Sequence, residues 1–284
     1  RDKLVTGVQT CALPILRVLV IDVDGRPGLA ALLSGGPAGA SADPLGYEPT
    51  LLVDGLGPSG TGRVHGRSLQ AAAALVEYLD SHGMRRVSKR LVSSGVVDVV
   101  STAAPGIDDL LVLGKVKQIE RSGEYDFIVV DGPAAGHAIT FLTAAAGLHD
   151  AIPSGPIHTQ AQDVLELLRD PERCQVVLVT LPEETPVNET VETAFALEDR
   201  VGVQLGPVII NALDTQGALL PESVNDAASA GLALLDADWE IARAAAEFRR
   251  SRAVRQLVQV QRSEEHTSEL QSLAYLVCRL LLEK

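Results

Sequence analysis

Short apolar runs alternate with helical stretches along this chain, and no other feature constrains its fold as strongly. The runs are rich in Val, Ile and Leu, as strands buried on both faces of a parallel sheet are. They lie at 17–23, 50–53, 127–131, 175–180 and 208–211. Helical patterns lie between and beyond them, at 68–81, 107–121, 138–146, 161–168, 187–199 and 230–249. This alternation predicts an α/β fold with a doubly wound, mostly parallel sheet.

The stretch at about 63–105 differs from the rest because it is dominated by helical patterns and has no strong strand signal. A long helical stretch between two strands predicts a helical insertion in the α/β fold.

The two ends of the chain are expected to be non-native. Residues 1–15 and 262–276 can be encoded by the opposite strands of one DNA string, which resembles a sequencing-library adapter whose continuation fits 277–284. We therefore leave residues 1–15 and 262–284 out of the prediction of the fold, as one does with residues left by cloning. Residues 16–261 remain, which is enough for one large α/β domain with a substantial core.

Charge and cysteine content exclude several classes of protein. The net charge of −13 argues against binding to nucleic acid or an anionic membrane surface. Cys174 is the one cysteine outside the excluded ends, so we expect no disulfide and no CxxC zinc site, as suits the cytoplasm. No apolar run reaches the ~18 residues of a membrane span, so direct membrane insertion is not expected. His149 and His158 lack metal-ligand partners at helical or hairpin spacing.

Polar residues follow the predicted strands at their carboxyl ends. Asp22 and Asp24 end the first run, Asp131 ends the third, Thr180 the fourth and Asn211 the fifth. Each alone suits a turn or a helix cap. In open α/β sheets, however, ligands bind beyond the carboxyl ends of the strands, so several such ends in one sheet predict a shared binding crevice. A carboxylate held there suits Mg²⁺ on the phosphates of a nucleotide.

The residues at these ends resemble a known family. VLVIDVDGRPGLAALL resembles its second strand and switch I, and VVDGPAAGH resembles its switch II, D-x-A-P-T-G-H, with Asp131, Pro133, Gly136 and His137 in register. The family is that of the deviant P-loop ATPases, the arsenite-pump (ArsA) and tail-anchored-protein-targeting (Get) group, especially its actinobacterial anion-transporting branch. The resemblance covers nearly all of 16–261 and implies a P-loop NTPase-like fold.

The resemblance also implies roles for individual residues with ATP and Mg²⁺ as cofactors. Asp24 would position the water that attacks the γ-phosphate, and Asp131 would contact Mg²⁺ through a water. Gly136 would offer its N–H to the γ-phosphate, and Pro133 would lie in the switch II turn before it. His137 would begin the helix that transmits the nucleotide state. Asn211 would hydrogen-bond adenine.

The same resemblance implies a cytoplasmic ATPase that works as a homodimer, or as a heterodimer with a paralogue. Its conformational change would act on a cargo or membrane-protein partner. The family's first strand and its K-G-G-V-G-K-T loop do not occur in this sequence; they would precede Leu16. Because this loop cradles the phosphates, we expect the chain as printed to be poorly folded and inactive.

Two alternatives remain open. The family usually has Ala or Thr at the position of Gly132 and Thr at the position of Ala135. These two departures leave open a second reading, a non-catalytic nucleotide-binding subunit of a dimer. The run Ile21–Gly25 also matches the motif of haloacid-dehalogenase-type phosphatases, with Asp22 as nucleophile and Asp24 as acid/base. The phosphatase reading is the weaker one, because the later lysine and acidic pair are not in place.

Overall fold

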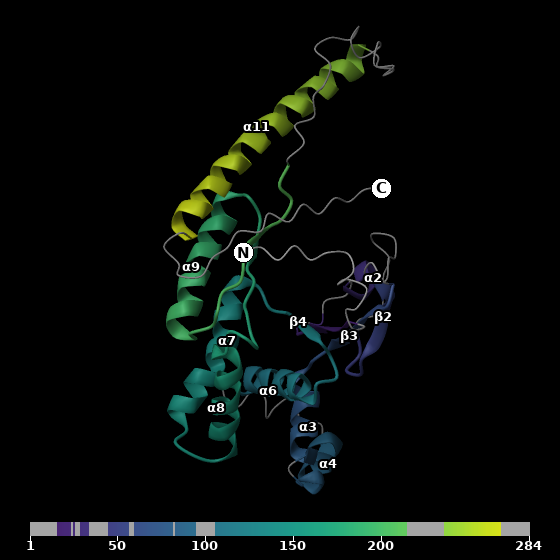
Figure 1. Cartoon of the computed structure of the whole chain (residues 1–284), viewed down its shortest axis with the longest axis vertical. Helices are drawn as coiled ribbons and strands as arrows, with labels where there is room; N and C mark the ends of the chain where they lie inside the picture. The colour runs from purple at the N-terminus through teal and green to yellow at the C-terminus, as the bar shows by residue number, and fades with distance from the viewer. Residues whose placement is uncertain are drawn as a thin grey trace, which may run out of the picture. The chain divides into compact units, whose positions relative to one another are not determined.

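The computed structural model describes residues 16–23, 25, 29–33, 45–56, 60–81, 83–94, 106–214 and 236–267. The chain divides into two compact units, which meet in sequence between Leu168 and Arg169. Each unit is described by itself (Figure 1).

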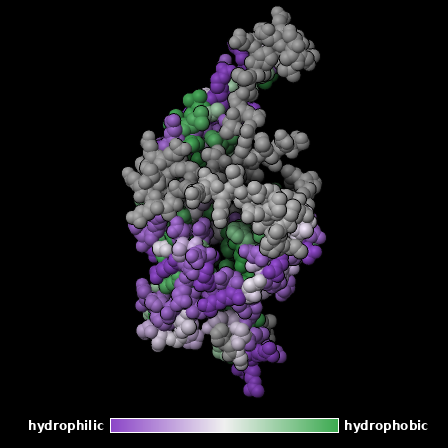
Figure 2. Space-filling view, in the orientation of Figure 1, coloured by the Kyte–Doolittle hydropathy of each residue, from purple (hydrophilic) through white to green (hydrophobic). Residues whose placement is uncertain are grey.

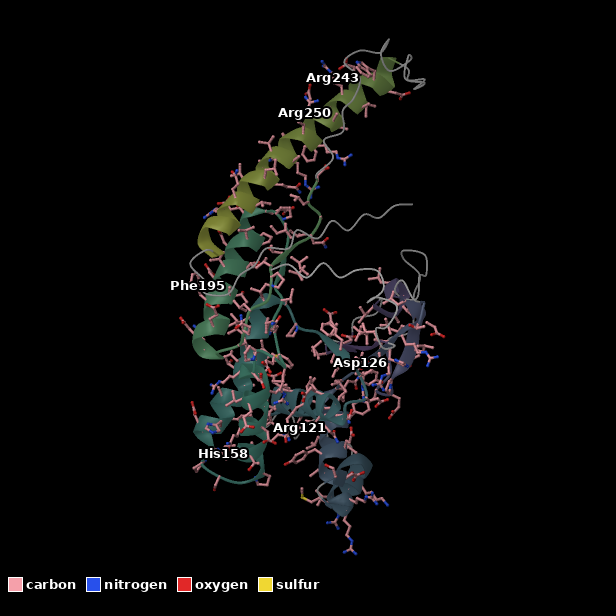
Figure 3. The ribbon with its side chains drawn as sticks, in the orientation of Figure 1. Arg121, Asp126, His158, Phe195, Arg243 and Arg250 are labelled. Atoms are coloured by element: carbon pink, nitrogen blue, oxygen red, sulfur yellow. The ribbon has the colours of Figure 1, made fainter. Side chains whose placement is uncertain are left out.

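The first unit is built on a four-stranded sheet with the order β2-β3-β1-β4. The strands β1 (Arg17–Asp22), β3 (Gly62–Ser68) and β4 (Phe127–Asp131) run parallel, and β2 (Thr50–Leu56) pairs antiparallel with β3. At the start of β4, Asp126 accepts a hydrogen bond of 2.7 Å from the backbone N–H of Arg17, which sets the register of the β1–β4 pair (Figure 3).

The first unit also contains helices. They are α2 (Leu29–Leu33), α3 (Ala71–Ser81), α4 (Arg85–Ser94), α6 (Ile107–Ser122), α7 (Ala135–Ala151) and α8 (Pro156–Arg169). Of these, α2 packs against β2. Helix α6 packs against both α3 and α7 and buries Leu110, Leu113 and Val116 at helical spacing. Leu19 and Ile21 of β1 are fully buried, and each such side chain stabilises the fold by about 1.5–3 kcal/mol.

The second unit contains two short parallel strands, β5 (Val179–Thr180) and β6 (Ile209–Ile210). An isolated bridge between Val176 and Leu205 extends the pair. Two long helices, α9 (Glu184–Arg200) and α11 (Asp236–Thr267), pack against each other in this unit. Figure 2 shows hydrophobic residues on α11; Ile241 and Phe248 are 70% and 65% exposed.

The predicted fold class is confirmed: the chain has a mixed α/β fold with a mostly parallel main sheet. The predicted strands form two sheets rather than one in the described residues, and the run at 175–180 is a strand only at its end. The predicted helices up to α9 are present within about five residues of the expected bounds. The last one was predicted at 230–249, but α11 continues to Thr267, and residues 230–235 lie outside the described part of the chain.

Strand β3 was missed by the sequence analysis, which treated 63–105 as helical without a strong strand. Its sequence, GRVHGRS, is polar and rich in glycine, yet five of its seven residues are buried. The glycines make room for neighbours: a Cβ at Gly66 would come within 2.4 Å of the Leu52 side chain of β2. Packing between strands, which no local pattern records, therefore decides this element.

Strand β4 differs from its predicted environment. A strand buried on both faces was expected, but Phe127 and Val129 are 59% and 40% exposed. Among the described residues β4 pairs with β1 alone, so it stands at the edge of the sheet. No element in the described part of the molecule therefore covers the exposed apolar side chains of β4.

Candidate functional site

Two carboxylates lie side by side at the carboxyl end of the main sheet. The strands β1 and β4 pair in a register that places Asp22 opposite Asp131. Asp22 is only 1% exposed, and its Oδ1 accepts a hydrogen bond of 2.9 Å from the N–H of Gly25, which fixes the turn after β1. Asp131 is exposed. The structure therefore buries one carboxylate as a support and presents the other to solvent.

The turn after β4 leads directly into α7. The Asp131 strand end is followed by Gly132, Pro133 and Ala134, and Ala134 is the N-cap of the helix, with no side-chain cap. The N–H groups of His137 and Ala138 bond to the Ala134 carbonyl at 2.8 and 2.9 Å. A helix start of this kind offers N–H groups and a partial positive charge to an anion.

The turn between β4 and α7 borders open space rather than packed side chains. A Cβ added at Gly132 or at Gly136 would meet no described atom within 4 Å. The His137 ring, one residue further on, is exposed. A ligand at the start of α7 could therefore approach the backbone closely, as a phosphate group requires.

The second unit holds two of the predicted strand-end residues, Thr180 and Asn211. The N–H of Asn211 donates to the Thr180 carbonyl at 2.8 Å, so the structure brings these two strand ends together. The side-chain oxygen of Asn211 accepts a hydrogen bond from the N–H of Ala212, whose φ is +56°. Asn211 is exposed. The structure thus forms two pairs of strand ends, Asp22 with Asp131 and Thr180 with Asn211, in separate units.

Asp24, the predicted water-positioning residue, lies outside the described residues. Its neighbours Asp22 and Gly25 are described, and they bear on the phosphatase alternative. A nucleophilic carboxylate must reach the substrate, whereas Asp22 is almost fully buried and bonded to the Gly25 backbone. This environment suits a structural carboxylate and disfavours Asp22 as a nucleophile.

Comparison with known proteins identifies the family. The family model described as anion-transporting ATPase matches residues 73–153, which include the turn after β4 and all of α7. ATPase BagA of Mycobacterium tuberculosis is 32% identical over 204 residues, covering 69% of this chain and 56% of BagA. The chain belongs to the ArsA/Get ATPase family.

Other relatives in the ArsA/Get family share shorter or more distant matches. The arsenical pump-driving ATPase of Escherichia coli is 34% identical over 126 residues, covering 41% of this chain and 21% of that protein. ATPase GET3B of Arabidopsis thaliana is 25% identical over 193 residues, covering 56% of this chain and 45% of that protein. The chain spans a little over half the length of BagA.

For a member of the ArsA/Get family, the first unit fits a magnesium-bound nucleotide at the start of α7. Asp131 supplies an exposed carboxylate oxygen, the kind of ligand that Mg²⁺ prefers. The uncapped helix start and the open space at Gly136 suit phosphate oxygens. No group of three or more His, Cys, Asp or Glu side chains is arranged to hold a metal in the described residues. A cation here would rest on Asp131, the nucleotide and water.

One neighbour of His137 was missed by sequence reasoning. Burial, with a smaller effect from Asp108, raises the pKa of the Asp109 carboxyl, and the His137 ring acts in the opposite direction. Asp109 lies in the first turn of α6, which packs against α7. In the sequence, Asp108 and Asp109 showed only that a helix begins there. The packing of α6 on α7 adds a half-buried carboxyl to the surroundings of His137.

The first unit also has an open pocket of about 470 Å³ between α3, α6 and α8, which several charged side chains line. Most of its charges are paired: Lys115 with Glu77, and Lys117 with Asp163, while Arg121 lies at the end of α6 (Figure 3). Lys117 is only 6% exposed, and a buried charge of this kind destabilises the fold unless it is paired, so the ion pair with Asp163 is needed there. These pairs hold the helices together, and none of the predicted site residues lines this pocket.

No helix in the described residues is both long and apolar enough to cross a membrane.

Proposed function

We propose that the intact protein is a Mg²⁺-dependent ATPase that uses ATP binding and hydrolysis as a conformational switch. One observation supports this proposal more strongly than any other. The exposed carboxylate of Asp131 ends a strand paired in register with β1, and it is followed by a helix start without a side-chain cap. This arrangement suits a phosphate group and its cation.

The residues of this chain have distinct roles in the proposed reaction. Asp131 holds the cation through a water, and the N–H of Gly136 binds the γ-phosphate region. Pro133 restricts the turn before α7. The structure starts this helix at Ala135 rather than at His137 as expected, so His137 lies in the first turn of the helix that responds to the nucleotide. Mg²⁺ supplies neutralisation of the charge on the phosphates.

Two further residues of the proposal lie away from this turn. Asp24 orients the attacking water, and Asn211 binds adenine. Both roles rest on the family resemblance. For Asn211, the exposed side chain at the end of β6 is compatible with that role.

The proposed reaction needs a phosphate-binding loop that this sequence does not contain. No G-K-[S/T] loop occurs in the 284 residues, and such a loop supplies the amides and the lysine that cradle the phosphates. We propose that this chain is a fragment of the ATPase, and that in the intact gene product the strand leading to the loop covers apolar strand surface. The exposed Phe127 and Val129 of β4 support this view. The chain as printed is then inactive.

The proposed partners follow from the family. We propose a cytoplasmic homodimer, or a heterodimer with a paralogous ATPase, that acts on a cargo or membrane-protein partner. One relative is named an arsenical pump-driving ATPase. For this chain arsenite chemistry is not proposed, because Cys174 is its single cysteine outside the expected non-native ends.

A second candidate is a nucleotide-binding subunit without turnover. The observation that favours it is Ala135, which stands where the family usually has a threonine hydroxyl. Such a subunit would bind ATP and change conformation within a dimer, while its partner hydrolyses the nucleotide.

The test uses the intact gene product, alone and mixed with any paralogue, and measures phosphate release and nucleotide binding with Mg²⁺. We expect Asp131→Asn to reduce turnover by about 10²-fold or more, as the loss of a charge-stabilising group does. Asp126→Asn is the matched control: it changes an Asp at the other end of β4, where an amide oxygen can still accept the Arg17 hydrogen bond. Equal turnover in the two variants would contradict the role of Asp131.

The same measurements separate the candidates. ATP binding without turnover, restored by a paralogue, supports the non-catalytic subunit. Absence of ATP binding by the intact product would overturn both candidates.

A further inference from the structure

One face of α11 holds the loop that follows β6 in the second unit. This loop, residues 211–214, begins at Asn211 beside the end of β5. Its other end is bonded to α11, because the N–H of Asp214 donates to Oε1 of Gln256 at 2.9 Å. Nε2 of Gln256 donates in turn to the Ala212 carbonyl oxygen, at 3.4 Å. Both the donor and the acceptor of this one side-chain amide are therefore used on the backbone of the loop.

Gln256 is deeply buried although its side chain is polar. The residue is 2% exposed. A buried amide destabilises a fold unless its donor and acceptor groups are paired, and here the loop supplies the partners. Removing the amide would leave the N–H of Asp214 without this acceptor. The bonds between Gln256 and the loop therefore explain why a polar residue is buried on this face of α11.

The loop has a backbone conformation that its own sequence does not favour. Ala212 has a φ of +56°, and within the described ranges no other residue except glycine has a positive φ. A residue with a Cβ adopts this left-handed conformation rarely, and mainly where its surroundings hold it there. The N–H of Ala212 donates to Oδ1 of Asn211 at 2.8 Å. The same conformation therefore orients the Asn211 amide and leaves its Nδ2 group to donate to a ligand.

A second side chain of α11 supports the loop from the same face. Arg249 lies seven residues, or two helical turns, before Gln256. Its Nε and Nη2 donate to the two carboxylate oxygens of Asp214, with a distance of 3.1 Å for Nη2. The Arg249 side chain is 50% exposed and that of Asp214 is 16% exposed. An exposed pair contributes little stability, but a bidentate pair fixes the direction of both groups.

We propose that Gln256 and Arg249 are positioning residues of the adenine site: they hold the loop after β6 in the conformation that presents Asn211 to the base. The proposal rests on the adenine role proposed for Asn211. The two residues act through the loop and need not touch the nucleotide. Their loss should therefore weaken the binding of the base and leave the binding of the phosphates unchanged.

The experiment compares two ligands of the intact gene product, ATP and inorganic tripolyphosphate, each titrated calorimetrically with Mg²⁺ present. Tripolyphosphate has no base, so its affinity does not depend on the loop. Gln256→Met keeps the approximate size of the side chain and removes its hydrogen bonds. We expect it to weaken ATP binding by about tenfold, since a buried N–H loses its partner, and to leave tripolyphosphate binding unchanged. Gln261→Met is the matched control, because it makes the same change at an exposed position of α11.

Two further measurements address the same loop. Arg249→Met should weaken ATP binding by about two- to threefold, as suits a half-exposed pair. Arg250→Met, at the neighbouring exposed position that Figure 3 labels on α11, should have no effect. Hydrogen exchange without nucleotide should show the Asp214 amide exchanging at least about tenfold faster in Gln256→Met than in wild type. Circular dichroism checks folding, and if Gln256→Met is unfolded, Arg249→Met decides by itself.

The possible outcomes separate this proposal from the proposed function. Unchanged ATP affinity in both folded variants would overturn the positioning role. An equal loss of affinity for ATP and tripolyphosphate would also overturn it, because that result indicates a structural role alone. Absence of ATP binding by the wild-type protein would instead remove the proposed function, and hydrogen exchange would still decide whether Gln256 holds the loop.

Discussion

At the scale of single residues, Glu77 connects three parts of the first unit. Its carboxylate accepts a hydrogen bond of 2.6 Å from the Tyr47 hydroxyl and another from Lys115. Arg67, buried at the end of β3, lies over the Tyr47 ring with its guanidinium carbon 4.7 Å from the ring centroid. Glu77 therefore links the segment before β2, helix α3 and helix α6.

This linkage predicts a pH dependence of stability. Burial acts to raise the pKa of Glu77, but the hydrogen bonds from Lys115 and Tyr47 outweigh it, so the pKa lies below its ordinary value of 4.5. A carboxyl with a lowered folded-state pKa stabilises the fold above its unfolded-state pKa, and this contribution is lost as the pH falls through the folded-state value. We expect Glu77→Gln to remove part of the decrease in melting temperature below pH 4.5.

Thermal unfolding measured by circular dichroism between pH 3 and 7 checks this prediction. Glu192→Gln is the control, because Glu192 is exposed on α9. If the curves for Glu77→Gln and wild type stay parallel through the acid range, the hydrogen bonds to Glu77 do not contribute in this way.

At the scale of elements, the contact between α6 and α8 depends on a glycine. Gly114 lies in the middle of α6, and a Cβ there would come within 1.8 Å of Nε2 of Gln160 on α8. In a helix interior, Ala is favoured over Gly by about 0.8–1.0 kcal/mol. The two effects oppose each other, since the methyl group must displace the Gln160 side chain.

A double-mutant cycle separates these effects. We expect Gly114→Ala in a Gln160→Ala background to stabilise the protein by about 1 kcal/mol, because the obstructing side chain is absent. In the wild-type background the gain should be smaller or reversed. Urea unfolding gives the four free energies, and strict additivity would mean that Gln160 does not oppose the alanine.

At the scale of the whole molecule, the exposed strand β4 is the main irregularity. Exposed apolar edge strands are templates for pairing with other chains, and Phe127 and Val129 lie on such an edge in the described residues. We expect the isolated chain to associate as its concentration rises.

A charge on this edge tests the expectation. Val129→Lys should reduce association in light scattering, and it should change the free energy of unfolding by no more than about 0.5 kcal/mol, as exposed substitutions do. Ile128→Lys, on the more buried face of the same strand, should instead destabilise the fold. Strong unfolding by Val129→Lys would mean that this side chain is covered.

Local patterns predicted most helices and the strand ends of the candidate site. The apolar run ending at Asp131 and the glycine-rich turn after it are local features, and the structure has both. Strand β3 could not be predicted in the same way, because its glycines and its arginines are stabilised by β2 and by Tyr47, which lie elsewhere in the sequence. Asp109 beside His137 depends likewise on the packing of α6 against α7.

Backbone propensity and the spacing of apolar residues act over a few neighbouring positions, so they were enough to place Asp131 at a strand end. They predicted the following helix from residue 138, whereas α7 begins at Ala135. Pairing and stacking join residues that are distant in the chain, and these came from the fold. The fold put Asp22 beside Asp131, left β4 at an edge and stacked His149 on His158. The physical reason is that burial and hydrogen bonding between elements are decided by which surfaces meet, and the local pattern of residues leaves that choice open.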